Sequence, residues 1–327
     1  MRERATVLLA ARLPAEFEQR LTQRFELLGP LLPPFAQTVS TLAAEDAQRV
    51  RVLITMGSAR VTREALARLP SLGLVCCIGS GFEGIDLAAA RDRRIVVTHG
   101  PDANASTVAD LALGLLIATV RRMPAEAAIL RRGEWKGNAA HRMPPVRGLT
   151  GRKVGIYGLG AIGAKIAARC VAFEMEVGYH NRNRRDDVAY RYLDSLEALA
   201  SWADVLVIAV RAGADTVHAV DARILAALGS GGHVVNIARG SVIDETALVR
   251  ALAEGTIAGA GLDVFEHEPS VPAELLAMTS VALTPHIAGA TTEAQGILQD
   301  MVCSNMDAFM AGLPVRNPVP GTPASYP

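Results

Sequence analysis

The ten residues VGIYGLGAIG, which run from Val154 to Gly163, decide the fold of this chain. The apolar residues before Gly158 predict a buried strand, and the glycines that follow have the spacing Gly-x-Gly-x-x-Gly. The first glycine permits a tight turn, the second lets the main chain approach a pyrophosphate, and the third lets a helix pack closely on the strand. The N-terminus of that helix then presents free N–H groups to the anion. The stretch therefore predicts a dinucleotide site formed by Gly158, Leu159, Gly160, Ala161, Ile162 and Gly163.

Further apolar runs around the glycine loop predict the rest of a doubly wound parallel sheet. Helical patterns lie between most of these runs, and strands that alternate with helices are typical of βαβ units. The predicted strands cover residues 153–157, 176–179, 205–209, 233–236, 258–262 and 281–283.

The first hundred residues repeat this alternation and predict a second α/β sheet. Its strands are expected at residues 6–10, 50–55, 72–78 and 95–98, with helices between them. One of these helices is expected to place Phe17, Leu21, Phe25 and Leu28 on a single face.

Two helical patterns indicate how the two sheets are connected. Residues 106–122, interrupted only by Gly114, predict a long spacer helix, and residues 291–310 predict a C-terminal helix that returns to the first sheet. Residues 133–149 are irregular and predict an arm. We therefore expect a Rossmann dinucleotide-binding domain, residues 102–288, inserted in a flavodoxin-like substrate-binding domain, residues 1–101 and 289–327.

Composition narrows the classes of function. The formal net charge of zero gives no overall field that would attract nucleic acid or a membrane surface. The four cysteines show no C-x-x-C pair or zinc-ligand spacing, so no metal is expected. The apolar run near the N-terminus is too short for a signal peptide, and no apolar stretch is long enough to span a bilayer. A cytoplasmic protein is therefore expected.

The end of the second strand of the Rossmann domain indicates which dinucleotide binds. NAD sites place an acidic residue here for the ribose 2′-hydroxyl, but this strand ends in Tyr179-His180-Asn181-Arg182 and lacks one. A guanidinium pairs well with a 2′-phosphate. Asn181 and Arg182 are therefore predicted cofactor contacts, and NADPH is favoured over NADH.

Three polar segments follow the last three strands and predict the reactive centre. They provide Arg239, Glu268 and His286, at strand ends where doubly wound sheets place their ligands. An arginine can clamp a carboxylate with two hydrogen bonds, a histidine can transfer a proton near neutral pH, and a carboxylate can orient that histidine. The set is that required for hydride transfer to a keto acid. The other histidines, His218 among them, have no such support.

These segments closely resemble the D-2-hydroxyacid dehydrogenase family, and most of all its glyoxylate/hydroxypyruvate reductase branch. The resemblance extends from about residue 72 to residue 317, and it includes the stretch VADLALGL at residues 108–115. It implies Arg239 as the substrate clamp, His286 as the acid–base group that also contacts substrate, and Glu268 as the partner of that histidine. It also implies that Asp263 and Thr107 contact the cofactor, with Arg239 beside it, and that the main chain at Ser80 and Gly81 holds the substrate carboxylate. A homodimer is expected on the same ground.

The prediction is therefore NADPH-dependent reduction of a small 2-keto acid to the D-2-hydroxy acid, with His286 as the proton donor. A 2-ketogluconate-type sugar-acid reductase and a nucleotide-sensing protein-binding module on the same fold are the alternatives. In some relatives the arm reaches the active site of the other subunit, so Trp135 and Met143 are candidates for substrate specificity.

Overall fold

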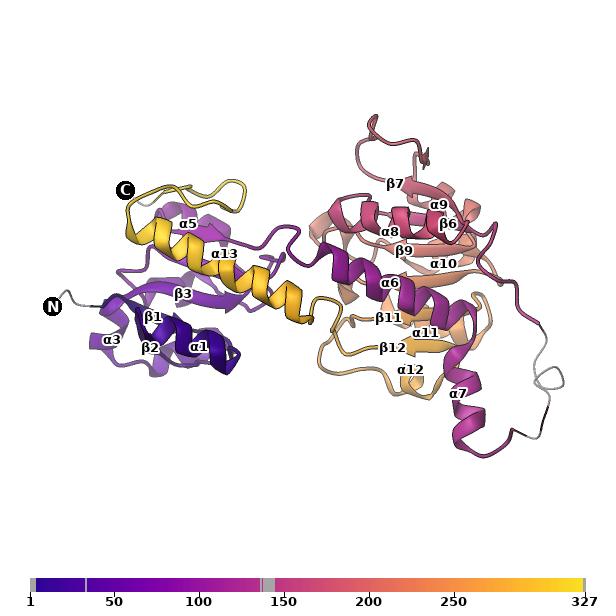
Figure 1. Ribbon diagram of the computed structural model, residues 1–327, viewed down its shortest axis with the longest axis horizontal. Helices are drawn as coiled ribbons and strands as arrows, with labels where there is room; N and C mark the ends of the chain where they lie inside the picture. Colours follow the sequence, from indigo (N-terminus) through magenta and orange to yellow (C-terminus); the bar gives the residue numbers. More distant parts are fainter. Residues whose placement is uncertain (1–3, 33, 136, 138–144, 326–327) are drawn as a thin grey trace. The chain divides into compact units, whose positions relative to one another are not determined.

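The computed structural model describes residues 4–32, 34–135, 137 and 145–325 of the chain. The chain divides into two compact units (Figure 1). Unit 1 contains residues 1–104 and 291–327, and unit 2 contains residues 105–290. Unit 2 is thus inserted in the sequence of unit 1, and α13, Thr292–Met310, belongs to unit 1.

Unit 2 is built on a seven-stranded sheet in the order β12-β11-β10-β9-β6-β7-β8. All neighbouring strands are parallel. The strand order reverses between β6 and β9, and open α/β sheets bind ligands at such a switch point. This confirms the predicted Rossmann sheet. Its strands are β6 Lys153–Tyr157, β7 Glu176–His180, β8 Arg191–Tyr192, β9 Val205–Ile208, β10 His233–Asn236, β11 Gly259–Leu262 and β12 Val281–Leu283.

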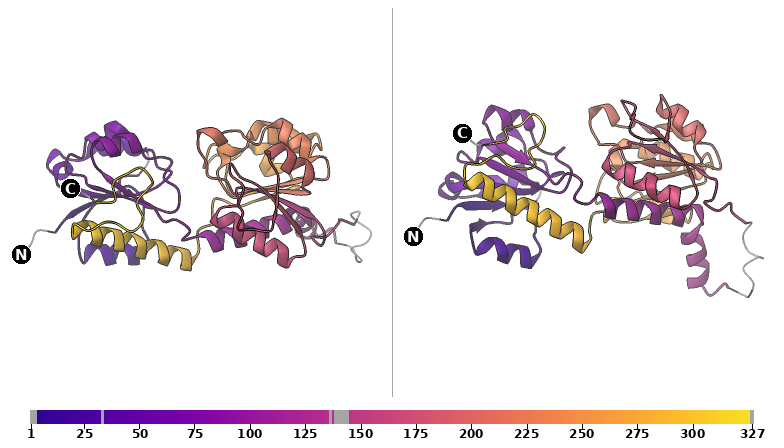
Figure 2. Two further views of the ribbon diagram at one scale, coloured as in Figure 1. Left: turned by 90° about the horizontal axis from the view of Figure 1, so that it is seen from above. Right: turned by 45° about the horizontal axis from the view of Figure 1, so that its top comes forward.

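Helices cover both faces of this sheet (Figure 2). On one face, α6, Ala105–Val120, and α8, Ala161–Ala172, bury the side chains of Val154, Val207 and Val235. The opposite face packs on α9 Leu196–Trp202, α10 Ala222–Leu228 and α11 Glu245–Ala253. Both faces are apolar because the strands are buried on both sides, as parallel sheets require. The short helices α7 Met123–Arg131 and α12 Ala273–Ala277 complete the unit.

Unit 1 contains a five-stranded parallel sheet in the flavodoxin-like order β2-β1-β3-β4-β5. Its strands are β1 Thr6–Leu9, β2 Glu26–Leu28, β3 Val50–Met56, β4 Leu74–Ile78 and β5 Val96–Thr98. On one face, α1, Ala15–Thr22, and α13 pack over the sheet through Phe17, Met306 and Phe309. The other face is covered by α2 Phe35–Thr38, α3 Ala44–Arg49, α4 Arg63–Ala67 and α5 Leu87–Asp92.

The predicted helical face from Phe17 to Leu28 is wrong in its second half. α1 ends at Thr22, and Leu28 lies in β2, where it pairs in parallel with Leu8 of β1. Phe25 is nevertheless buried with Phe17 in the same core, so the apolar spacing reflects burial on two different elements. The sequence pattern also missed β8 and α7, which are short or largely exposed.

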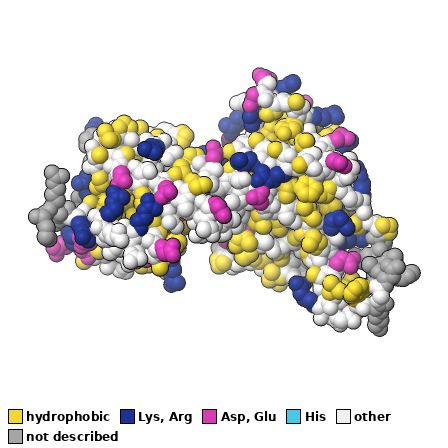
Figure 3. All heavy atoms as spheres, viewed as in Figure 1, with side chains coloured by type: hydrophobic (Ala, Val, Ile, Leu, Met, Phe, Trp, Pro, Cys, Tyr) yellow, Lys and Arg dark blue, Asp and Glu magenta, His cyan; other side chains and the backbone are white. Residues whose placement is uncertain are grey.

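Acidic and basic side chains are interspersed on the face of the molecule seen in Figure 3, in keeping with the net charge of zero. In the part of the chain that the structure describes, no helix is both long and apolar enough to cross a membrane.

One buried histidine makes the stability of unit 2 depend on pH. His233 begins β10, its side chain is buried, and its Nδ1 atom has no hydrogen-bond partner among the described residues. Burial, together with the charge of Arg152, lowers the pKa of His233 to about 4 from its usual 6.5. The folded state therefore keeps His233 neutral at a pH where the unfolded chain already binds a proton.

We expect acidification to destabilise the protein through His233. The stability that the folded protein has with a neutral His233 is fully present above pH 6.5 and is lost as the pH falls towards 4. Since each pH unit in this window changes the unfolding free energy by about 1.4 kcal/mol, the loss between pH 6.5 and 5 is about 2 kcal/mol. Urea unfolding of the wild type and His233→Gln at pH 7 and pH 5 measures it. An equal loss in both proteins would contradict this assignment.

Candidate active site

The three glycines of the phosphate loop serve three different purposes. Gly158 has a φ of +101°, and a Cβ atom there would lie 2.5 Å from the main-chain nitrogen of Val210. A Cβ on Gly163 would lie 2.1 Å from the carbonyl oxygen of Gly158. Gly160, by contrast, is the N-cap of α8, and its Cβ position has no atom within 4 Å. Two glycines are thus required by packing, and the third leaves an open cradle over a helix N-terminus, which fits a pyrophosphate.

The loop after β7 is fixed to this cradle. The Asn181 side chain accepts a hydrogen bond from the Leu159 N–H at 2.6 Å, and Arg185 donates to the Leu159 carbonyl at 3.0 Å. Arg182 is different, because its side chain is 81% exposed and pairs with Asp215 at 2.9 Å. No motif in the sequence assigns a role to Asp215, which lies on the turn that follows β9.

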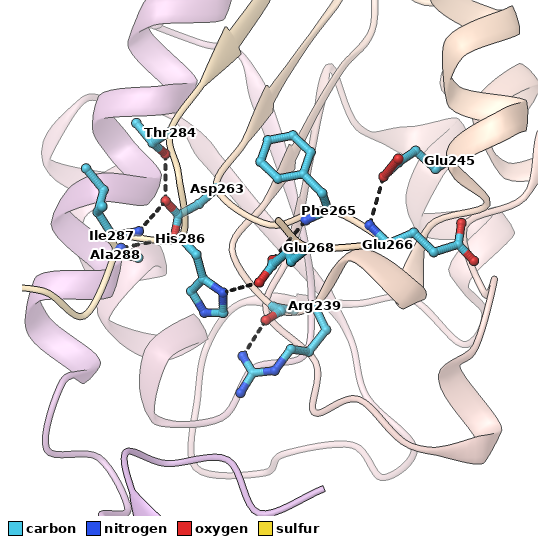
Figure 4. Close-up of polar contacts among 11 residues, drawn as sticks. Arg239, Glu245, Asp263, Phe265, Glu266, Glu268, Thr284, His286, Ile287 and Ala288 are labelled. Carbon is cyan, nitrogen blue, oxygen red and sulfur yellow. Dashed lines mark hydrogen bonds and ion pairs between the residues drawn. The ribbon is translucent and has the colours of Figure 1, made fainter. Parts of the chain in front are cut away.

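Glu268 and His286 come together at the carboxyl edge of the sheet (Figure 4). The His286 Nδ1 atom donates to a Glu268 carboxylate oxygen at 2.8 Å, and both side chains are partly exposed. The second Glu268 oxygen accepts from the Phe265 N–H at 3.1 Å. The carboxylate therefore holds the histidine through one nitrogen and leaves the other nitrogen for a ligand.

Arg239 follows β10 on a turn that Asn236 stabilises. The buried Asn236 side chain accepts from the Ala238 N–H and donates to the Arg239 carbonyl, each at 3.0 Å. The Arg239 guanidinium itself donates to the Ala238 carbonyl at 2.7 Å (Figure 4). The next residue, Gly240, lies against main chain, since a Cβ there would be 1.9 Å from the carbonyl carbon of Phe265. The segments that carry Arg239 and Glu268 are thus in direct contact.

Asp263 fixes the segment that carries His286. Its buried carboxylate accepts hydrogen bonds from Thr284 Oγ1 at 2.6 Å, the Ile287 N–H at 2.9 Å and the Ala288 N–H at 3.0 Å. Its carbonyl accepts from the His286 N–H at 2.8 Å. These bonds hold His286 at a φ of +52°, a left-handed conformation that L-residues rarely adopt. The predicted contact of Asp263 with the cofactor stays a prediction.

A second histidine–glutamate pair lies beside the first. His218 Nε2 donates to a Glu266 carboxylate oxygen at 2.6 Å, and this hydrogen bond raises the pKa of His218. The Glu266 N–H donates to the buried Glu245 side chain at 2.8 Å. The sequence patterns assign no catalytic or binding role to His218, Glu266 or Glu245.

The remaining predicted residues lie on two elements. Ser80 and Gly81 follow β4 in unit 1, where the Ser80 carbonyl accepts a hydrogen bond from the ring of His99 at 3.0 Å. Thr107 lies in the first turn of α6 in unit 2. Trp135 is 60% exposed, and Met143 lies outside the described residues. Across the described ranges, no group of three or more His, Cys, Asp or Glu side chains could hold a metal ion.

Comparison with known proteins shows the family of this chain. Residues 113–288 match the NAD binding domain of the D-isomer specific 2-hydroxyacid dehydrogenases. The chain is 36% identical over 313 residues to a hydroxyphenylpyruvate reductase of Plectranthus scutellarioides, covering 96% of this chain and 98% of that protein. Identity and coverage are the same for glyoxylate/hydroxypyruvate reductase A of Arabidopsis thaliana.

A solved structure matches both units. It is the NADPH-dependent glyoxylate/hydroxypyruvate reductase of Sinorhizobium meliloti in complex with NADP and malonate, with a TM-score of 0.90, 37% identity and 99% of each chain covered. Since relatives above 30% identity span nearly the whole chain, the shared family follows from sequence and structure alike. The protein is therefore an oxidoreductase of the D-2-hydroxyacid dehydrogenase family, in its glyoxylate/hydroxypyruvate reductase branch, and it uses a nicotinamide dinucleotide.

Proposed function

We propose that this enzyme reduces a small 2-keto acid to its D-2-hydroxy acid with NADPH, and that His286 is the proton donor. The observation that carries the proposal is the 2.8 Å hydrogen bond between His286 and Glu268, at the sheet edge that also bears Arg239. These are an acid, the group that orients it, and a cation for the substrate carboxylate.

The chemistry needs a hydride and a proton. The nicotinamide, when bound, supplies the hydride to the keto carbon. His286 gives the proton to the carbonyl oxygen, so the product is a neutral hydroxyl group and the histidine is left deprotonated. Glu268 stabilises the protonated ring beforehand and directs its other nitrogen towards substrate.

Arg239 binds the substrate carboxylate in this mechanism. Its guanidinium now donates to the Ala238 carbonyl, and it exchanges that contact for two charge-assisted hydrogen bonds to the substrate. The main-chain N–H groups at Ser80 and Gly81 are proposed substrate contacts, because a glycine-rich turn presents amides to an anion. Asp263 and Thr107 are proposed cofactor contacts.

The test of this function is the initial rate of NADPH oxidation with a panel of keto acids. The panel contains glyoxylate, hydroxypyruvate, pyruvate, 4-hydroxyphenylpyruvate and 2-ketogluconate, with NADH measured in parallel. We expect fast NADPH-dependent turnover of one or two of them. Turnover of 2-ketogluconate alone would identify a sugar-acid reductase, and cofactor binding without any turnover would favour a nucleotide-sensing module.

Substitutions at the histidine–glutamate pair test the proton donor. We expect His286→Gln to lower kcat/KM by roughly 10²–10⁴-fold, the range of a lost general acid. Glu268→Gln keeps the shape of the side chain but removes its charge, so a smaller loss and an altered pH profile of kcat/KM are expected. His267→Gln, an exposed residue of the same turn, is the matched control. Wild-type rates in His286→Gln would exclude His286 as the donor.

We propose that Arg182 binds the 2′-phosphate of NADPH. Its side chain forms an exposed pair with Asp215, and exposed pairs contribute little stability, so a phosphate can displace the carboxylate. We expect Arg182→Ala to weaken NADP⁺ binding by about 10–100-fold and NAD⁺ binding hardly at all. Calorimetric titration with both nucleotides measures this, and Arg184→Ala is the control. A preference for NADP⁺ that survives Arg182→Ala would refute the assignment.

A cytoplasmic homodimer is the state that we propose for the enzyme. The four cysteines are free and buried, which suits a reducing compartment. On unit 2, exposed apolar side chains gather on α7 and α12, and Figure 3 shows hydrophobic side chains over α7. Beside them lies a cavity of about 490 Å³ lined by α6, α7 and α12, a surface suited to a second copy.

A further inference from the structure

His218 connects two segments that carry proposed catalytic residues. Its main-chain N–H donates to the Ser241 carbonyl at 2.8 Å, on the segment that follows Arg239. Its ring donates to Glu266 at 2.6 Å, on the segment that leads to Glu268. One residue, distant in sequence from both, therefore contacts each segment two positions away from its proposed catalytic side chain.

Two further contacts restrict movement of the segments that carry Arg239 and Glu268. Gly240 lies in van der Waals contact with the Phe265–Glu266 peptide, and the Glu266 N–H is held by the buried Glu245 carboxylate. A shift of Glu266 would therefore move the peptide on which Gly240 rests, and Arg239 with it. The same shift would move Phe265, whose N–H donates to Glu268.

The His218 backbone is strained, so the surrounding contacts must hold it in place. Its φ is +50°, in the left-handed region, where a non-glycine residue is strained by about 1 kcal/mol or more. The His218 ring is 42% exposed, so its pair with Glu266 adds little to overall stability. The charged groups around it are Glu266 and Asp244, both acidic, and the hydrogen bond with Glu266 raises the pKa of His218.

We propose that His218 is a positioning residue, which through Glu266 fixes the Arg239 and Glu268 segments relative to each other. It touches neither substrate nor cofactor in this role. The proposal rests on the proposed function, because it gives Arg239 the substrate carboxylate and Glu268 the orientation of His286.

The test compares His218→Ala with His218→Gln. Alanine removes the ring contact, whereas the glutamine side-chain amide can donate to the same carboxylate. With NADPH and the fastest keto acid of the panel, we expect His218→Ala to raise KM and lower kcat, for a combined loss on the order of 10–100-fold. We expect His218→Gln to recover most of this loss. Oxamate, a keto-acid analogue, should bind His218→Ala in the presence of NADPH about tenfold more weakly by calorimetry.

Controls separate positioning from folding. The NADPH dissociation constant of His218→Ala should stay within about twofold of the wild type and its Tm within about 3 °C, since an exposed pair contributes little stability. His267→Gln should behave as the wild type in every assay. Wild-type kcat/KM in His218→Ala would overturn the proposal. A loss of kcat/KM that persists in His218→Gln would also overturn it, and so would an equal loss of NADPH affinity in His218→Ala. Wild-type kcat/KM in Arg239→Ala would instead refute the proposed function itself.

Discussion

The buried carboxylate of Asp263 is the interaction on which the reactive edge depends. It lies at the end of β11 and binds three donors from the loop after β12, so it joins two strand ends through a charge that is shielded from water. A buried carboxylate is tolerated only when hydrogen bonds satisfy it, and here the donors lie on both sides of His286. The left-handed backbone of His286 is the consequence, because the loop must turn sharply to place the Ile287 and Ala288 amides on one carboxylate.

The same edge collects the proposed catalytic residues because the sheet is parallel. The carboxyl ends of β10, β11 and β12 lie side by side, so segments far apart in sequence meet without any long loop. Asn236, Asp263 and Glu245 are all buried polar residues at this edge. The side chains of Asp263 and Glu245 bind the main chain of a neighbouring segment, and that of Asn236 binds the main chain of its own turn. The edge is therefore a network of side chain-to-main chain bonds, with Arg239, Glu268 and His286 as its more exposed members.

Periodicity in the sequence was sufficient for most strands, since a buried parallel strand appears as a continuous apolar run. It failed at Glu26–Leu28, where three half-buried residues form an edge strand and continue the apolar spacing of α1. The glycine loop and the three polar strand ends were predictable because they are local patterns. The His218–Glu266 and Arg182–Asp215 pairs were not, because their members lie 48 and 33 residues apart and meet only through the fold.

Of the three glycines in the phosphate loop, Gly160 is the one that packing does not require. Gly158 and Gly163 are required by close packing, so folding alone accounts for them. At Gly160 the space beyond the main chain is open, and a side chain there would meet no part of the protein. Gly160 is also the N-cap of α8, a position where glycine is far more favourable than alanine, so the fold loses little by having it there. Without a side chain, the main chain at the start of α8 is left open to the close approach of an anionic ligand.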